Sequence, residues 1–267
     1  MYLCNSLLKQ IYVNLSRTLS DSYNMYSLFV KEIKVFLTSL IGYFVIGVFL
    51  TLTGLFLWVF PMSYNVLDRG FADVNGLFGL APIVFLLLVP AITMRSFAEE
   101  KRVGTIEVLL TMPLSDTQII LAKYFASVVL VLVSLLPTFI YFLSAYFLGY
   151  PKGNIDFGAM WGSYIGLVFL GSTFASIGIF CSLLTDSQIV SFILSVLISF
   201  IVWLGFDFVY SFDVFGSFGQ IIKWLGIDHH YASISRGVID TRDILYFISV
   251  IMLFLLMSRL RLQSRKW

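Results

Sequence analysis

Five stretches of the sequence contain no Asp, Glu, Lys or Arg, and each is long enough to cross a membrane as a helix. A helix rises ~1.5 Å per residue, so crossing the hydrocarbon of a bilayer takes ~20 apolar residues. A sixth stretch, Ile244–Ser258, is shorter but almost wholly apolar, and Arg242 and Arg259 can extend from its ends to the headgroups. The sequence therefore predicts an all-α integral membrane protein, a six-helix transmembrane bundle. The charge-free stretches are 35–67, 74–94, 124–151, 157–185 and 187–206.

The composition agrees with a membrane protein. Of the residues, 59% are hydrophobic and 12% are charged, with a mean hydropathy of +0.94, whereas about 25% of the residues are charged in a soluble domain. At 267 residues the chain fits one transmembrane domain, 25–267. Residues 1–24 are polar and lack the basic-then-apolar layout of a signal peptide, so they are expected to be a disordered N-terminal extension.

The segment that begins at Tyr26 has apolar and polar residues on opposite faces of a helix. This pattern predicts an amphipathic helix that lies in the membrane interface before the first span. The alternative is a simple extension of the first span. The apolar positions are Phe29, Val30, Ile33, Phe36 and Leu37, and the polar ones are Lys31, Lys34 and Thr38.

A charged segment, Arg95–Tyr124, separates the second and third apolar stretches. Its charges require water or a protein partner, so this segment is expected to face an aqueous compartment. Without further information, an ordinary polar hairpin loop is the alternative to a functional segment. The charged residues are Arg95, Lys101, Arg102 and Lys123, with Glu99, Glu100, Glu107 and Asp116.

Residues that break and cap helices divide the charged segment into parts. Gly104 is expected to end a helix, and Thr105 to cap a short amphipathic helix, Ile106–Met112, by accepting a hydrogen bond in its first turn. Pro113 ends that short helix. Ser115 and Gln118 then form a capping-box pattern at the start of the next apolar stretch.

The same segment resembles the cytoplasmic loop of the type-2 ABC exporter permeases. The resemblance is carried by the run Glu-Glu-Lys-Arg-Val-Gly-Thr at 99–105, by Leu110 and Pro113, and by Lys123 at the start of the next helix. A second segment, 229–243, is similar to the extracytoplasmic segment before the last span of that family. The resemblance extends from about Met25 to the end of the chain. Within the family the chain is most similar to gliding-motility permeases, and more distantly to the permease of the nitrous-oxide copper cluster.

The resemblance implies that the short helix is a coupling helix that docks on a separate ABC ATPase subunit. It also implies pairing with a second copy of the permease, or with a similar permease, in the lipid bilayer. Ile106, Leu109 and Leu110 share one helical face, which is available either to fill a cleft in the ATPase or to lie on the bundle. The predicted partner-binding residues are Glu99, Glu100, Lys101, Arg102, Gly104, Thr105, Ile106, Glu107, Leu109, Leu110 and Pro113.

The distribution of basic residues predicts the orientation. If the N-terminus is inside, inner segments hold twelve of the seventeen Lys and Arg residues. Both termini and the charged segment are then cytoplasmic, and the chain is expected in the inner (cytoplasmic) membrane.

Small and polar residues elsewhere suggest further local structure. Gly158, Gly162, Gly166, Gly171, Ala175 and Gly178 form a small-residue stripe, which fits either packing within this subunit or a dimer interface. Thr185–Gln188 is a second capping-box pattern.

The stretch 207–243 predicts short helices at the outer interface, with apolar positions that include Val214, Phe215 and Phe218. Within it, Asp228, His229 and His230 suggest either a metal site or packing, and packing is favoured because adjacent histidines do not share a helical face.

The sequence contains no phosphate-binding loop, no readable pairing of a nucleophile with a base, and no basic stripe of the kind that binds nucleic acid. The chain is therefore not expected to be an enzyme or to hold a cofactor or metal. The predicted function is a permease subunit that couples ATP hydrolysis by a partner to transport in gliding motility. A structural membrane anchor of a motility or secretion complex is the alternative. A membrane enzyme is disfavoured, because no acidic residue falls at the middle of a span.

Overall fold

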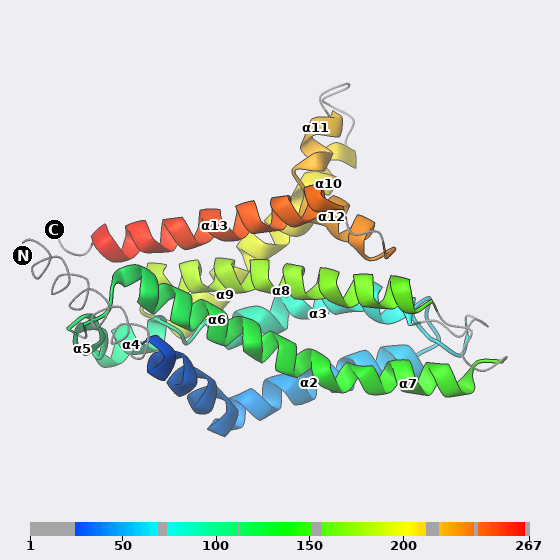
Figure 1. The fold of residues 1–267 in the computed structure, drawn as a ribbon, viewed down its shortest axis with the longest axis horizontal. Coiled ribbons are helices and arrows are strands. Elements are labelled where there is room, and N and C mark those ends of the chain that lie inside the picture. Colours follow the sequence, from blue (N-terminus) through cyan, green and yellow to red (C-terminus); the bar gives the residue numbers. More distant parts are fainter. Residues whose placement is uncertain are drawn as a thin grey trace, which may run out of the picture.

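The computed structural model describes residues 25–68, 74–111, 113–150, 156–211, 219–237 and 240–264. Within these ranges the chain is helical without strands, and six helical stretches are long and apolar enough to cross a membrane. The predicted all-α membrane bundle is confirmed (Figure 1). The six stretches are Leu40–Trp58, Asn75–Val103, Asp116–Leu148, Phe157–Leu184, Gln188–Ser211 and Thr241–Gln263. The predicted N-terminal extension, 1–24, lies outside the described residues.

The labelled elements of the described ranges are helices. Their bounds are α2 Leu40–Trp58, α3 Asn75–Thr93, α4 Ala98–Val103, α5 Ile106–Leu110, α6 Asp116–Leu135, the 3-10 turn η1 Leu136–Thr138, α7 Phe139–Leu148, α8 Phe157–Leu184, α9 Gln188–Phe200, the π-helical turn η2 Ile201–Gly205, α10 Phe206–Ser211, α11 Gly219–Trp224, α12 Ile227–Ile234 and α13 Thr241–Gln263. In Figure 1, α4, α5 and the C-terminal end of α13 lie at one end of the bundle, and α10, α11 and α12 gather around the opposite end of α13.

The helix 25–38 before the first span is separate from α2. It ends at Ser39, whose hydroxyl oxygen accepts a hydrogen bond from the Gly42 amide and so caps α2. Leu28 and Phe36 are the hydrophobic residues of this helix that are buried. The amphipathic helix predicted at this place is therefore present, and it is not a simple extension of the first span.

Helix α8 is the centre of the bundle, because it packs against α3, α6, α9, α12 and α13. Its small-residue stripe allows this close packing. A Cβ atom on Gly162 would lie 2.7 Å from the Cα of Gly237, and one on Gly171 would lie 2.7 Å from a Val131 methyl. A Cβ atom on Gly178 would overlap Thr93. Packing within the subunit therefore accounts for Gly162, Gly171 and Gly178, whereas Gly158 is exposed.

Several predicted features differ from the structure. The third span begins at Asp116, earlier than the charge-free stretch 124–151, because Ser115 caps it and Lys123 lies inside the protein. The fifth span continues through η2 to Ser211, so the outer segment begins later than 207. The pattern at Thr185–Gln188 is not a capping box. Thr185 accepts a hydrogen bond from the Ser187 amide, which closes the turn, and Ser187 precedes α9 without a side-chain cap.

The outer segment contains the expected short helices, α11 and α12. His230 holds α12 in place through Nδ1, 2.7 Å from Asp243 Oδ1, and through Nε2, 2.8 Å from the Trp224 carbonyl oxygen. Its ring stacks on Tyr246 with 3.9 Å between centroids. The contacts of His230 are those of a packed residue, and in the described ranges no three His, Cys, Asp or Glu side chains cluster as metal ligands would. Val214, Phe215 and Phe218 lie outside the described residues.

Asp228, on α12, is partly buried, and the Trp203 indole donates a hydrogen bond to its Oδ1 across 3.2 Å. Burial raises the pKa of Asp228, and the nearby Asp207 carboxylate raises it further, whereas Trp203, Lys223 and His229 lower it. The folded state thus binds this proton more tightly than the unfolded chain. The resulting stabilisation is complete below the ordinary pKa of about 3.9 and is lost as the pH rises through the raised value.

Replacing Asp228 by asparagine is therefore expected to raise the temperature of unfolding near neutral pH, because asparagine keeps an oxygen acceptor for Trp203 but carries no charge. The gain should shrink as the pH falls towards about 4. Thermal unfolding of the detergent-purified protein across this pH range measures the effect, with Asp68→Asn at an exposed site as the control. A gain that grows at low pH would contradict the explanation.

Candidate functional site

The predicted turn between two helices is present at Gly104. Helix α4 ends there with Gly104 in the left-handed region at φ 81°, a conformation that favours glycine, and α5 begins two residues later. The capping box at the start of α6 is also confirmed. The Ser115 amide donates to Gln118 Oε1 over 2.8 Å, and Ser115 Oγ accepts from the Gln118 amide.

Two details of the predicted short helix are wrong. Thr105 makes no side-chain cap, because its backbone is already helical at φ −75° and ψ −8°, and its hydroxyl instead lies 3.4 Å from the Glu100 carbonyl oxygen. The helix also ends at Leu110, with Thr111 as its C-cap, so it is shorter than Ile106–Met112. Met112 itself lies outside the described residues.

The apolar face of α5 lies on the bundle. Ile106 and Leu109 are buried in a hydrophobic cluster that joins α5 to other helices at this end of the protein, and Leu110 packs against it. Of the two possibilities for this face, packing on the bundle is therefore correct for Ile106 and Leu109. The cluster also contains Leu28, Phe97, Ile119, Ile120, Ala122, Ile179, Leu183 and Leu262.

The surface that α4 and α5 leave to solvent is formed by other residues. Val103 is 61% exposed and Val108 is 63% exposed. Thr105 and Glu107 are exposed between these two valines in the sequence. Val103 and Val108 thus add exposed apolar area next to the charged Glu107, and a protein partner can cover a surface of this kind.

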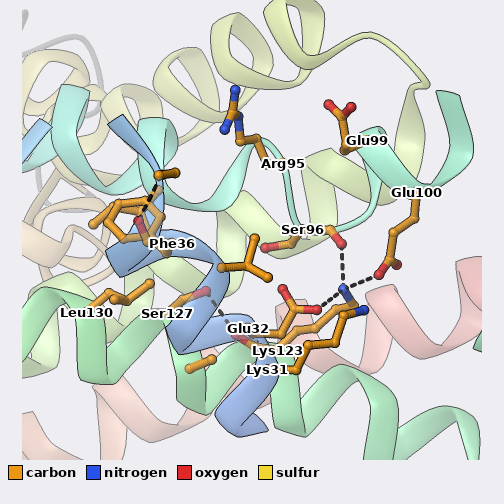
Figure 2. Close-up of a pocket in the computed structure, with 14 residues that line it drawn as sticks. Lys31, Glu32, Phe36, Arg95, Ser96, Glu99, Glu100, Lys123, Ser127 and Leu130 are labelled. Carbon is orange, nitrogen blue, oxygen red and sulfur yellow. Dashed lines mark hydrogen bonds and ion pairs between the residues drawn. The ribbon is translucent and has the colours of Figure 1, made fainter. Parts of the chain in front are cut away.

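Lys123 is the least expected residue of the site, because it is only 1% exposed. Its ammonium group donates to Glu32 Oε1 over 2.9 Å, to Glu100 Oε1 over 2.9 Å and to the Ser96 carbonyl oxygen over 2.7 Å. Figure 2 shows these three acceptors converging on the Lys123 nitrogen. The ammonium also lies 5.0 Å from the centre of the Phe97 ring, within the range of a cation–π contact.

The acceptors of Lys123 come from separate elements. Glu32 is on the helix 25–38, Ser96 is in the turn after α3, and Glu100 is on α4. One buried cation on α6 therefore holds these three parts of the chain together. In the sequence, Glu32 lies four residues from both Leu28 and Phe36, so a charge at the centre of a buried helical face was the signal for this pairing.

Lys101 makes a second connection from α4. Its side chain is only 3% exposed and its ammonium donates to the Leu183 carbonyl oxygen at the end of α8, with Asp186 3.7 Å away. By contrast, Arg102 and Glu99 form an exposed ion pair with each other. The predicted charged residues thus divide into two groups. Glu100 and Lys101 fix α4 to the bundle, while Glu99, Arg102 and Glu107 remain near the surface.

The arrangement is suited to mechanical transmission. Helix α4 is held by ion pairs to Lys123 of α6, which also pairs with Glu32 of the helix 25–38, and to Asp186 in the turn after α8. Helix α5 is held by apolar packing in the cluster that includes Leu262 of α13. A displacement of α5 is therefore shared among several helices instead of being absorbed in a loose loop.

Comparison with known proteins bears on this site. A family model described as "ABC-2 family transporter protein" matches residues 64–260, which is well over half of the chain and includes α4, α5 and Lys123. A search of curated proteins found no match.

Proposed function

Because the chain belongs to the ABC-2 family of transporters, of which it is a membrane-spanning permease, we propose that it is the permease of an exporter powered by a separate ATPase subunit. The observation that carries the proposal is the α4–α5 segment, which is anchored to the bundle by Lys123 and Lys101 while Val103 and Val108 face outward. In this proposal α5 is the coupling helix, and the exposed face of α4 and α5 docks on the ATPase.

The ion pairs give the docked ATPase a route into the membrane domain. A push on α5 would pass to α4, then from Glu100 of α4 to Lys123 of α6, and from Lys123 to Glu32 of the helix 25–38. The turn between α8 and α9 would receive it through Lys101. Since α8 packs against most of the other spans, its movement would rearrange the bundle.

The proposal includes an orientation and partners. The sequence segments assigned to the inner side hold twelve of the seventeen basic residues, so in this proposal the end with α4 and α5 faces the cytoplasm, and the protein lies in the inner membrane with both termini inside. The chain carries no phosphate-binding loop, so ATP is hydrolysed in the partner and this chain is not itself the enzyme. A second permease copy, or a similar permease, completes the transporter. The exposed apolar faces of α2, α9 and α13 are available to that copy and to lipid.

The cellular process proposed is gliding motility. Support comes from the resemblance of the chain, which within the type-2 ABC permease family is most similar to gliding-motility permeases. The two segments that carry the family resemblance, 99–105 and 229–243, overlap the anchored α4 and the α12 helix, where His230 is bound to Asp243.

The test is purification of the full, tagged chain in a mild detergent with its native partners. We expect an ABC ATPase subunit to co-purify, and ATP turnover to appear only when that subunit is present. If a homogeneous preparation of this chain alone hydrolyses ATP, and denaturing the chain abolishes that activity, the assignment of ATP hydrolysis to a separate subunit is wrong. A motility or secretion complex that contains this chain but no ATPase would favour the structural anchor instead.

A further inference from the structure

A cavity of about 330 Å³ lies beside the Lys123 cluster. Its walls come from the helix 25–38, the C-terminal end of α3, the turn after it, α4 and α6 (Figure 2). Among its lining residues, Ser39 directly precedes the first span, and Ile92 is next to the last residue of α3. The cavity therefore lies where the spans α2 and α3 meet the membrane surface, which is the depth of lipid headgroups.

The charges that line the cavity are balanced. Three cations and three carboxylates contribute, so the lining has no net charge. The Lys123 ammonium is fully used by its three acceptors. Such a lining suits a ligand that carries both signs of charge better than one with a net charge. The charged lining residues are Lys31, Arg95 and Lys123, with Glu32, Glu99 and Glu100.

Two buried polar atoms of this lining have no hydrogen-bond partner in the described part of the chain. One is the Nε–H donor of Arg95, and the other is the Oε2 acceptor of Glu100. Burying a donor or an acceptor without a partner is costly, and such atoms are usually satisfied by a ligand or by water. The Arg95 Nε–H requires an acceptor and Glu100 Oε2 requires a donor. A ligand that satisfies both atoms must therefore offer both kinds of group. Figure 2 shows Arg95 apart from the Lys123 cluster, on the same part of the cavity as Glu99.

The remaining wall of the cavity is apolar. Phe36, Ile92 and Leu130 are buried there, and Val35 is exposed at the same lining. A hydrocarbon chain that leaves the cavity along Val35 would pass directly onto the apolar surface of the bundle. An acyl chain can pack along this apolar wall, and a soluble zwitterion has no such chain, so the apolar side favours a lipid.

We propose that this cavity binds the headgroup of an aminophospholipid, of the phosphatidylethanolamine type, from the adjacent leaflet. Arg95 donates to the phosphate, and the ammonium group of the lipid donates to the carboxylates of Glu99 and Glu100. A net-anionic lipid such as phosphatidylglycerol can donate only from neutral hydroxyl groups and brings no positive charge to those carboxylates. A phosphatidylcholine carries the same charge but has no N–H to donate. The lipid would thereby contact the helix 25–38, α4 and α6 together.

The test uses the full chain in mild detergent, to which phosphatidylethanolamine, phosphatidylcholine and phosphatidylglycerol with identical acyl chains are added in equal amounts. Native mass spectrometry then counts the lipids retained by each protein. We expect phosphatidylethanolamine to be retained in preference to the other two. Arg95→Gln should weaken its retention by about tenfold, the effect of losing one charge-assisted hydrogen bond. Arg261→Gln, an exposed arginine at the same end of the bundle and outside the cavity, is the matched control and should retain the lipid normally.

A second variant keeps the test informative if Arg95→Gln does not fold. Val35→Trp narrows the cavity from an exposed position without removing a charge, and it should also reduce retention of phosphatidylethanolamine. Soluble phosphoethanolamine should compete poorly, because it lacks the acyl chain. The proposal is overturned if the three lipids are retained equally, if both cavity variants retain phosphatidylethanolamine as the unaltered chain does, or if phosphoethanolamine competes as well as the lipid.

Discussion

Lys123→Met is expected to destabilise the folded protein by roughly 3–5 kcal/mol, the cost of removing one partner from a buried ion pair. The carboxylates of Glu32 and Glu100 and the Ser96 carbonyl oxygen all lose the donor that they share. Because both carboxylates are largely buried, water cannot fully replace the ammonium group. The measurement is the amount of monodisperse protein in detergent and its temperature of unfolding.

Two control variants separate the effect of leaving buried carboxylates without their cation from the effect of changing the Lys123 side chain itself. The triple variant Glu32→Gln, Glu100→Gln, Lys123→Met removes all three charges and should recover much of the stability, because no uncompensated charge remains. Arg102→Gln breaks the exposed ion pair with Glu99 and should cost about 1 kcal/mol or less. If Lys123→Met is as stable as the unaltered chain, the three acceptors are satisfied by water and the cluster does not hold these elements together.

The second large effect concerns the exposed valines and rests on the proposed function. The double variant Val103→Asp, Val108→Asp should abolish co-purification of the ATPase. A central apolar contact of an interface commonly contributes 2 kcal/mol or more, which is roughly a thirtyfold change in affinity. The abundance and thermal stability of the permease should remain normal, since both side chains are already exposed.

Two neighbouring positions on α5 are the controls. Glu107→Gln changes an exposed charge and should alter the affinity for the ATPase by no more than about 1 kcal/mol. Ile106→Asp puts a carboxylate into the buried cluster and should lower the amount of folded protein itself. If the double valine variant keeps its ATPase, the docking surface lies elsewhere and α5 is an ordinary hairpin segment.

The six membrane spans and the turns at Gly104 and Ser115 could be predicted from the sequence alone. A bilayer leaves each backbone polar group to be satisfied within its own helix, so a long charge-free stretch has little choice of structure. Local chemistry was similarly decisive at Gly104, where the left-handed backbone favours glycine, and at Ser115 and Gln118, where the two partners are three residues apart. These features depend on residues that are close together along the chain.

Only the tertiary structure decided which charged residues are buried and which face of α5 points outward. Lys123 and Glu32 are 91 positions apart, and Lys101 and Leu183 are 82 apart. The spacing of Leu28, Glu32 and Phe36 indicated that Glu32 would face the protein, but nothing local indicated which cation would meet it. Thr105 could have capped α5, but the chain enters that helix already in helical conformation, which leaves its hydroxyl to another acceptor. The outward direction of Val108 follows because Ile106 and Leu109 are already packed on the bundle. A short helix has several possible faces, and the one that is buried is set by the neighbours that surround it.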